Sequence, residues 1–353
     1  MRARAGAALP VLLRPVGRSR WGMAAALAAT LGLLLIVPQL QGRPALGSAL
    51  ALGFVLTAVP TLPTTWRPAL TTMSARAAAV LVGGFLVVAC ADHPVALAVV
   101  TVGAAVAGAL IHRVGATAGL AVVLIDIDLN TDTGGPPSLA DLPAYVIGAA
   151  TVFAAWAAWW VTARTVAALR DQRLGDQEQP ARGVNRAHAV RVAVAVAVAV
   201  VLAGTLPDDL VGGHWLVTSV LLTIQPGRPA TRVRLVQRLC GNTAGAVIAA
   251  VLLGAHPAVP VAVAVTVLLF LLAVALRPVN YTWWAITGPP VLLVISEYPH
   301  WFPWYEGAVR LAMNLLGAAI VVAIVFAAPR AWGYFHRRQE SDSVYKIQCK
   351  EAS

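Results

Sequence analysis

The chain has 353 residues, of which 59% are hydrophobic and 12% are charged. Ordinary soluble domains carry about 25% charged residues to cover their cores, so this composition excludes a soluble globular protein. The formal net charge of +11 suits a nucleic-acid-binding protein. However, the basic residues lie mainly in the breaks between apolar segments, which argues against nucleic acid as a partner.

Apolar segments long enough to cross a bilayer follow one another from residue 21 onward. Such segments predict membrane-spanning helices, because a helix satisfies its own backbone hydrogen bonds in hydrocarbon. The first six cover residues 21–39, 46–62, 75–91, 95–111, 114–129 and 143–163. The second six cover residues 188–206, 212–226, 238–254, 257–276, 281–296 and 307–328. The sequence therefore predicts an all-α polytopic membrane protein with about twelve transmembrane helices.

The polar breaks divide the chain into five predicted regions. They are a cytoplasmic N-terminal segment (1–20), a first six-helix membrane half (21–163), a cytoplasmic linker (164–187), a second six-helix half (188–328) and a cytoplasmic tail (329–353). With the N-terminus in the cytoplasm, only Arg43 and Arg310 of the 26 lysines and arginines fall on the outer half. This asymmetry predicts a multi-pass protein of the cell (plasma) membrane with both termini cytoplasmic.

The sequence contains no motif for a metal, a cofactor or a nucleotide. The three cysteines, Cys90, Cys240 and Cys349, lack metal-ligand spacing. A phosphate-binding Gly-x4-Gly-Lys-Ser/Thr loop is absent. We expect no cofactor and no direct use of ATP, so active transport would require an ion gradient.

The two halves share landmarks at a nearly constant distance along the chain. Matching residues separated by 162, 162, 163 and 164 positions are Arg76 and Arg238, Gly83 and Gly245, His93 and His256, and Arg113 and Arg277. Each half has six segments, an even number, so both halves have the same orientation in the membrane. This pattern predicts two parallel six-helix repeats.

A shorter repeat lies within the second half. Trp215-Leu-Val-Thr218 resembles Trp284-Ala-Ile-Thr287, and Arg238-x3-Asn242-x2-Gly245 resembles Arg310-x3-Asn314-x2-Gly317. These units are three segments long, an odd number, so the second is inverted relative to the first. Inverted three-helix repeats inside parallel halves are typical of transporters.

The Arg-x3-Asn pattern favours binding of an anion. Residues four apart lie on one helix face, so Arg238 and Asn242 point the same way, as do Arg310 and Asn314. A helix start also favours negative charge, and inversion places the two pairs near opposite leaflets, as two carboxylate sites. The alternatives are that Arg238 is a positive-inside anchor and that Arg310 pairs with Glu306, one turn earlier.

Aromatic and small polar residues accompany these arginines. Trp215 and Trp284 are candidates for stacking an aromatic solute, with Thr218, Gln225 and Thr287 as polar partners. Tryptophans at the membrane interface are the alternative. Gly288-Pro289-Pro290 interrupts the eleventh segment, and such breaks lie beside binding cavities or form a simple kink.

Carboxylates alternate at the end of the fifth segment, in Asp126-Ile-Asp128. Neighbouring like charges and partial burial favour protonation, so Asp126, Asp128 and Glu306 are candidates for proton coupling. Solvated loop residues are the alternative. The spacing also resembles the Asp-rich diphosphate sites of membrane prenyltransferases. No second motif of that kind exists, and we therefore expect that the protein is not an enzyme.

The stretch from Trp215 to Gly245 resembles the fusaric acid resistance (FUSC) family of the aromatic acid exporter superfamily. The shared order is Trp215, Thr218, Gln225-Pro226, Thr231 and then Arg238-x2-Gly241-x3-Gly245. Asn242 stands where the family usually has threonine. The resemblance covers about 188–328, and Arg310 to Gly317 is similar to a second, weaker element of the family. In the first half only Arg76 and Gly83 match.

The resemblance implies proton-driven export of aromatic or other small organic acids. The plant aluminium-activated malate channels are distant relatives, so an organic-anion channel is an alternative, and a membrane scaffold without transport activity is a third. The expected partners are a small organic acid and the lipid bilayer. A homo-oligomer is compatible with each of these functions.

Overall fold

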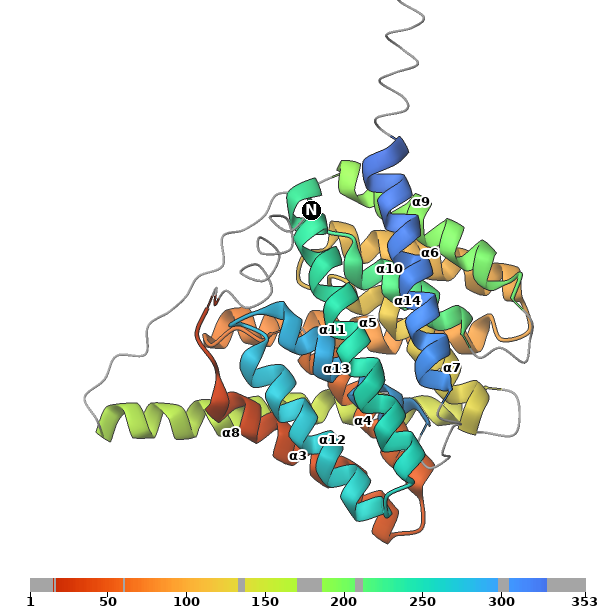
Figure 1. Cartoon of the computed structure of the whole chain (residues 1–353). Helices are drawn as coiled ribbons and strands as arrows, with labels where there is room; N and C mark the ends of the chain where they lie inside the picture. The colour runs from red at the N-terminus through yellow and green to blue at the C-terminus, as the bar shows by residue number, and fades with distance from the viewer. Residues whose placement is uncertain are drawn as a thin grey trace, which may run out of the picture.

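The computed structural model describes residues 15, 17–59, 61–132, 137–169, 186–206, 212–297 and 305–328. These residues fold into helices joined by short turns, without a strand in the described ranges (Figure 1). The helices of the first half are α3 (Trp21–Leu40), α4 (Pro44–Ala58), α5 (Trp66–Ala89), α6 (Pro94–Leu110), α7 (Thr117–Asp132) and α8 (Leu142–Leu169). Those of the second half are α9 (Arg186–Ala203), α10 (Gly213–Thr223), α11 (Arg228–Ala255), α12 (Val259–Leu276), α13 (Tyr281–Glu297) and α14 (Glu306–Val322).

Each of the twelve predicted segments coincides with one of these helices. Two short elements adjoin them: a 3-10 turn over Leu139–Asp141 precedes α8, and a π-helical turn over Ala323–Ala327 continues α14. Two starts differ clearly from the prediction, because α5 begins at Trp66 and α11 at Arg228. Helix α8 extends to Leu169, six residues into the predicted linker (164–187). The predicted tail lies outside the described residues.

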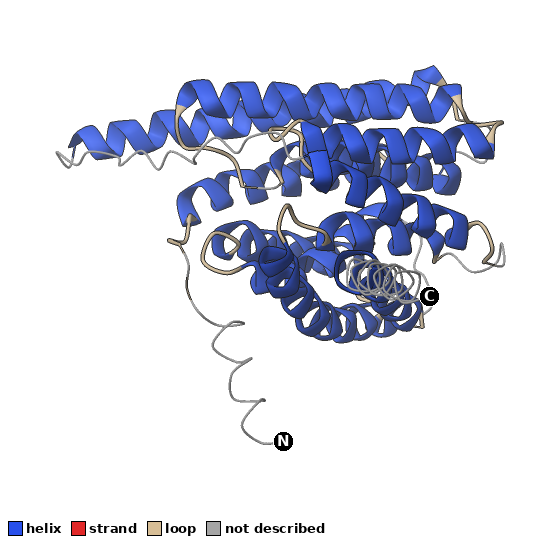
Figure 2. Cartoon of the chain, turned by 90° about the horizontal axis from the view of Figure 1, so that it is seen from above, coloured by secondary structure: helices blue, strands red, loops and turns tan. Residues whose placement is uncertain are grey.

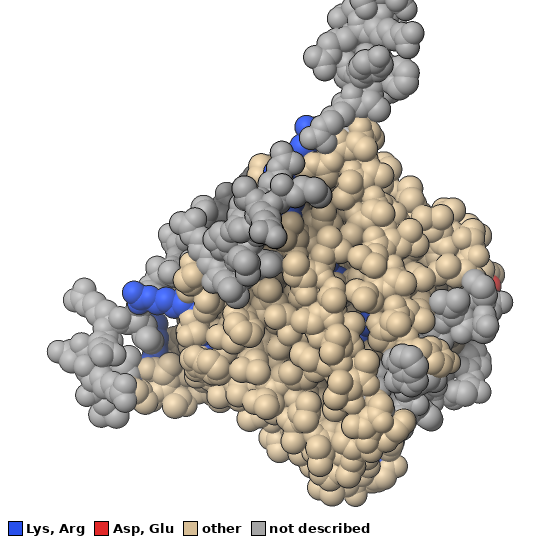
Figure 3. All heavy atoms as spheres, viewed as in Figure 1, with Lys and Arg blue, Asp and Glu red and all other residues tan. Residues whose placement is uncertain are grey.

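Within the described residues, seven helices are long and apolar enough to cross a membrane: α3, α5, α8, α9, α11, α12 and α14. Three more, α4, α6 and α13, are apolar but shorter. The face that α11, α12 and α14 present in Figure 3 carries almost no charged side chains, as a lipid-facing surface requires. The chain is therefore a multi-pass membrane protein, and its described residues fold as helices.

The short helices α4, α7, α10 and α13 form the centre of the bundle. Helix α4 contacts α7 and α13, and α10 contacts α7. Nearly every side chain of α4 from Gly47 onward is buried, and in α10 all those from Trp215 to Leu221 are buried. With 11 residues, α10 is about 17 Å long, roughly half the thickness of the hydrocarbon core. Viewed from above, the described residues form closely packed helices joined by loops (Figure 2).

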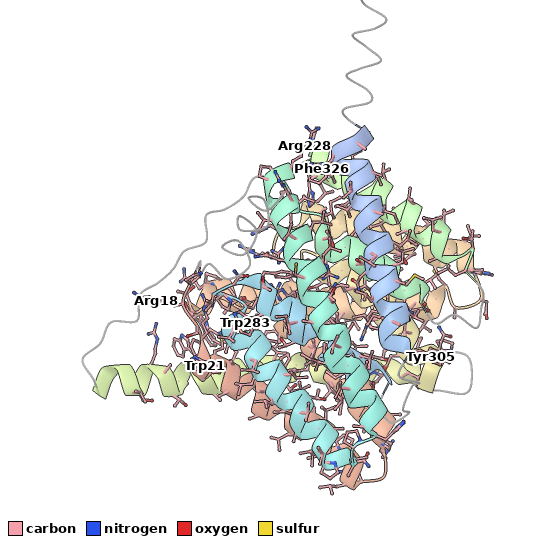
Figure 4. All side chains as sticks on the ribbon, viewed as in Figure 1. Arg18, Trp21, Arg228, Trp283, Tyr305 and Phe326 are labelled. Carbon is pink, nitrogen blue, oxygen red and sulfur yellow. The ribbon has the colours of Figure 1, made fainter. Side chains whose placement is uncertain are left out.

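The helix contacts of the first half recur in the second half. Helix α5 packs on α7 as α11 packs on α13, and α4 packs on α8 as α10 packs on α14. The two halves also exchange equivalent contacts, because α6 packs on α9 and α12 packs on α3. Arg228, at the start of α11, lies near Phe326, beyond the end of α14, whereas Tyr305 lies at the opposite end of α14 (Figure 4). Helices α11 and α14 are therefore antiparallel.

Candidate functional site

A small cavity lies between α10, α11, α13 and α14. It encloses about 20 Å³, room for about one water molecule. Its walls combine two arginines and an asparagine with two tryptophans and a threonine. The lining residues are Trp215, Thr218, Leu222, Arg238, Trp284, Ala285, Gly288, Pro289, Leu292, Arg310 and Asn314.

Asn314 connects the two Arg-x3-Asn motifs. Its Oδ1 accepts hydrogen bonds from Arg238 Nη2 at 3.0 Å and from Asn242 Nδ2 at 2.8 Å. Its Nδ2 donates to the backbone carbonyl of Arg310 at 2.8 Å. The predicted shared face of Arg238 and Asn242 therefore meets its counterpart on α14 across one helix interface.

Arg238 is buried, with 6% of its surface exposed. Its Nη1 donates to the hydroxyl of Tyr281 at 3.2 Å, and its Nε has no hydrogen-bond partner. Within the described part of the chain, no carboxylate pairs with this guanidinium. A buried cation without a counter-charge is costly, so the site is electrostatically prepared for an anion.

Arg310 is also buried, and it interacts with two elements of the cavity wall. Its Nη1 donates to the carbonyl oxygen of Pro289 at 2.9 Å, and its Cζ lies 3.1 Å from the centre of the Trp215 ring. The guanidinium thus stacks on an aromatic face as a cation–π pair. The predicted contact with Glu306 lies outside the described side chains.

The structure corrects the prediction of two anion sites in opposite leaflets, because Arg238 and Arg310 line one cavity. The prediction failed because it started the ninth segment at Arg238, whereas α11 begins ten residues earlier, at Arg228. Arg238 therefore lies about 15 Å along the helix, level with Asn314. Unpaired N–H groups at a helix start consequently do not contribute at Arg238.

The Gly-Pro-Pro break in α13 explains why glycines follow Arg238. Pro289 and Pro290 lack an N–H, so the carbonyls four residues earlier, of Ala285 and Ile286, lose their helical donors. A Cβ added to Gly245 would lie 2.5 Å from the Ile286 carbonyl oxygen and 3.4 Å from that of Ala285. The glycine lets α11 approach these carbonyls closely, where Cα–H donors can replace part of the lost bonding.

The other predicted binding residues divide into two groups. Trp215, Thr218 and Trp284 line the cavity as expected. Gln225 does not: its side chain bonds to the carbonyl of Ile224, in the turn between α10 and α11. Thr287 is buried, but its hydroxyl donates to the carbonyl of Trp283 within α13. These two residues stabilise local structure.

Sequence reasoning missed Tyr281, whose ring and hydroxyl contact three arginines. Arg234 Cζ is 3.4 Å from the centre of its ring and Arg277 Cζ is 5.6 Å away, while Arg238 bonds its hydroxyl. Tyr281 lies 43 residues after Arg238 and belongs to no repeated motif. Only its position at the start of α13, near Trp284, could have suggested it.

The candidate proton-coupling residues lie in different environments. Asp128 is buried, and its carboxyl oxygens lie 2.7 Å from Ser48 Oγ and 2.5 Å from Tyr145 Oη. Asp126 is partly exposed and accepts a bond from Asn130 Nδ2 at 3.0 Å. The side chain of Glu306 is outside the described part. Asp128 is thus the more enclosed of the two described candidates, and neither Asp126 nor Asp128 lines the arginine cavity.

The fold and this cavity define a multi-pass helical membrane protein with a buried basic site in its second half. A family profile described as "Fusaric acid resistance protein-like" matches residues 194–324, which include every residue lining the cavity. Over the region that it covers, the match agrees with the resemblance seen in the residues from Trp215 to Gly245.

A relative from Haemophilus influenzae, described as an uncharacterized protein, is 27% identical over 166 residues. The alignment covers 45% of this chain and 23% of the relative, so the chain spans about a quarter of that relative's length. No solved structure matches the chain.

Proposed function

We propose that the protein is a gradient-driven exporter of small organic acids, with a preference for aromatic ones. The observation that carries this proposal is the pair of buried arginines, Arg238 and Arg310, which line one cavity together with two tryptophans. A carboxylate can bind both guanidiniums with charge-assisted hydrogen bonds. It would also provide the counter-charge that Arg238 lacks among the described residues.

The remaining wall residues suit an aromatic body attached to the carboxylate. Trp215 and Trp284 offer ring faces for stacking. The Thr218 hydroxyl is buried without a hydrogen-bond partner among the described residues, so it is available to a polar substituent. This combination favours an aromatic acid over an inorganic anion.

The architecture supports a carrier. We infer twelve spans in two parallel six-helix halves, each made of two inverted three-helix units. The recurring helix contacts and the antiparallel α11 and α14 support this inference. A cavity of about 20 Å³ cannot hold an aromatic acid, so binding would require the cavity to enlarge, as in a carrier that opens to one side at a time. Positive-inside asymmetry supports cytoplasmic termini.

Transport assays in inside-out membrane vesicles test the proposal. A panel of aromatic and aliphatic acids is offered to wild type, Arg310→Ala and Arg310→Lys, with Arg43→Ala as a control because Arg43 is an exposed arginine before α4. We expect gradient-dependent accumulation by wild type and by Arg43→Ala. Arg310→Ala should lose it while protein levels persist, and Arg310→Lys should recover only part, since lysine lacks the planar fork.

The same assays distinguish the alternatives. Full export by Arg310→Ala would remove the site assignment. Substrate-dependent currents without accumulation would identify an organic-anion channel, and neither activity from a well-folded protein would favour a scaffold.

A further inference from the structure

A buried carboxyl network connects the first half of the bundle to α13. Asp128, on α7, has 1% of its surface exposed. Its Oδ1 lies 2.7 Å from Ser48 Oγ, on α4, and its Oδ2 lies 2.5 Å from Tyr145 Oη, on α8. An ionisable group this deep in a membrane bundle is rare and usually functional.

Ser48 also reaches the second half of the chain. Its Oγ lies 2.5 Å from the backbone carbonyl oxygen of Ile295, near the end of α13. In a continuing helix that carbonyl would accept from the N–H of the residue four positions later. That residue is Pro299, which has no N–H. Ser48 therefore provides the hydrogen-bond donor that the backbone at position 299 cannot provide.

The number of hydrogens determines the protonation state of this network. A serine hydroxyl has one hydrogen and a carbonyl oxygen has none, so the 2.5 Å contact requires Ser48 to donate to Ile295. The contact of 2.7 Å between Ser48 and Asp128 then needs a hydrogen from the carboxyl group. Tyr145 donates its own hydrogen to the other carboxyl oxygen, so all three contacts are satisfied when Asp128 is a neutral carboxylic acid.

We propose that Asp128 is the proton-binding site of the carrier and that its proton controls the attachment of α13 to α4. When the carboxylate binds a proton from one aqueous side, it becomes an acid that donates to Ser48, and Ser48 donates to Ile295. When the acid releases that proton to the other side, Ser48 turns its hydrogen to the carboxylate. The Ile295 carbonyl then loses its donor.

Helix α13 connects this network with the substrate cavity, and this step rests on the proposed function. The carbonyl of Pro289, six residues before Ile295 and about 9 Å away along the helix, accepts a hydrogen bond from Arg310. One interrupted helix thus bonds to the substrate arginine at one point and to the proton-controlled serine at another. A shift of α13 upon proton release would therefore change the wall of the cavity.

The helices around Asp128 differ in the ionisable groups that they carry. Helices α4 and α6, which pack against α7, contain no ionisable residue. On α5, Arg76 bonds to backbone carbonyls, and Arg67 is exposed near the start of the helix. On α10, His214 stacks on Trp215. On α8, Tyr145 contacts the carboxyl and Arg164 packs on Trp160. On α7 itself, Asp126 bonds to Asn130, and on α13, Tyr281 bonds to Arg238. The side chains of Asp132 and Glu297 are outside the described part.

Reconstituted proteoliposomes test the coupling. Asparagine at position 128 has the shape of the protonated acid, because its amide can donate to Ser48 and its oxygen can accept from Tyr145. We expect Asp128→Asn to lower proton-gradient-driven accumulation of an aromatic acid at least tenfold, while exchange of external for internal substrate continues. Asp92→Asn, which changes an exposed carboxylate in the turn between α5 and α6, is the control and should accumulate substrate like wild type.

A second measurement does not depend on transport. A hydrophobic carbodiimide reacts with protonated, membrane-buried carboxyl groups, and mass spectrometry identifies the labelled residue. We expect Asp128 of the wild-type protein to be labelled at neutral pH and labelling to disappear at alkaline pH. Labelling without any organic-acid transport would refute the proposed function and leave the proton site standing. Undiminished gradient-driven accumulation by Asp128→Asn, or an unlabelled Asp128 in wild type, would overturn the proton site.

Discussion

Each half of the molecule has an arginine at the same position of its third helix, but the surroundings of the two arginines differ. Arg76 follows the start of α5 by ten residues, and Arg238 follows the start of α11 by ten residues. Arg76 donates to the backbone carbonyls of Arg113 and Thr57, each at 3.3 Å. Arg238 instead donates to the side chains of Tyr281 and Asn314 and lines a cavity.

The positions that complete the site in the second half are apolar in the first half. A shift of 162 residues places Val152 at the position of Asn314 and Gly148 at that of Arg310. Val152 is fully buried, and Gly148 lets α8 lie directly against the backbone of α4 at Leu50. One half has therefore closed the equivalent space by packing, while the other has kept it polar, so the same scaffold supports structure in one place and binding in the other.

The largest expected difference is between Arg238→Ala and Arg76→Ala. Removing Arg238 should reduce transport per folded molecule about 10- to 100-fold, since hydrogen bonds to a charged group contribute about 1.5–3 kcal/mol. Removing Arg76 takes the Arg76 donor from the buried Thr57 carbonyl and should cost about 1–3 kcal/mol of stability, with transport per folded molecule nearly unchanged. Vesicle transport normalised to folded protein, together with thermal unfolding in detergent, separates the two effects. Equal transport losses would show that both halves bind substrate.

The second comparison concerns glycines that follow these arginines by seven residues. Gly245→Ala should destabilise the protein by about 1–3 kcal/mol, because its new Cβ would meet a rigid backbone carbonyl, of Ile286, at 2.5 Å. Gly83→Ala should cost less, because its nearest neighbour is the Ala121 Cβ at 3.0 Å. The midpoint of thermal unfolding measures both variants. A larger loss for Gly83→Ala would contradict the role assigned to the Gly-Pro-Pro break.

The sequence predicted the helices better than it predicted the site, for a physical reason. Hydrophobic length identifies each segment, and all twelve predicted segments are helical. Arg238 and Asn242 follow from helical periodicity. The contacts of these two residues with Asn314 depend on how α11 and α14 are aligned along their axes. That alignment follows from the start of α11 at Arg228, which the hydropathy of the sequence does not indicate. The contacts of Tyr281 with Arg238 and of Ser48 with Asp128 join residues 43 and 80 positions apart, without a motif to connect them.

A third comparison concerns tryptophans with different partners. Trp215 lies under the Arg310 guanidinium and lines the cavity, so Trp215→Leu should weaken binding of aromatic acids about three- to tenfold, with less effect on aliphatic acids. Trp156 packs with Trp66 and donates to the carbonyl of Pro63. Trp156→Leu should therefore lower stability without changing the order of preferred substrates. Competition assays with matched acid pairs measure this order, and an unchanged order in Trp215→Leu would contradict the stacking role.

The smallest expected effects come from one glycine in each half that meets no neighbour. An added Cβ finds nothing within 4 Å at Gly103, in α6, or at Gly254, in α11. Alanine is favoured over glycine inside a helix by about 0.8–1.0 kcal/mol, so Gly103→Ala and Gly254→Ala should each stabilise the protein slightly and leave transport unchanged. Thermal unfolding should show similar small gains. A loss of transport in Gly254→Ala but not in Gly103→Ala would mean that α11 contacts another surface when the cavity opens. The two halves would then differ in movement as well as in binding.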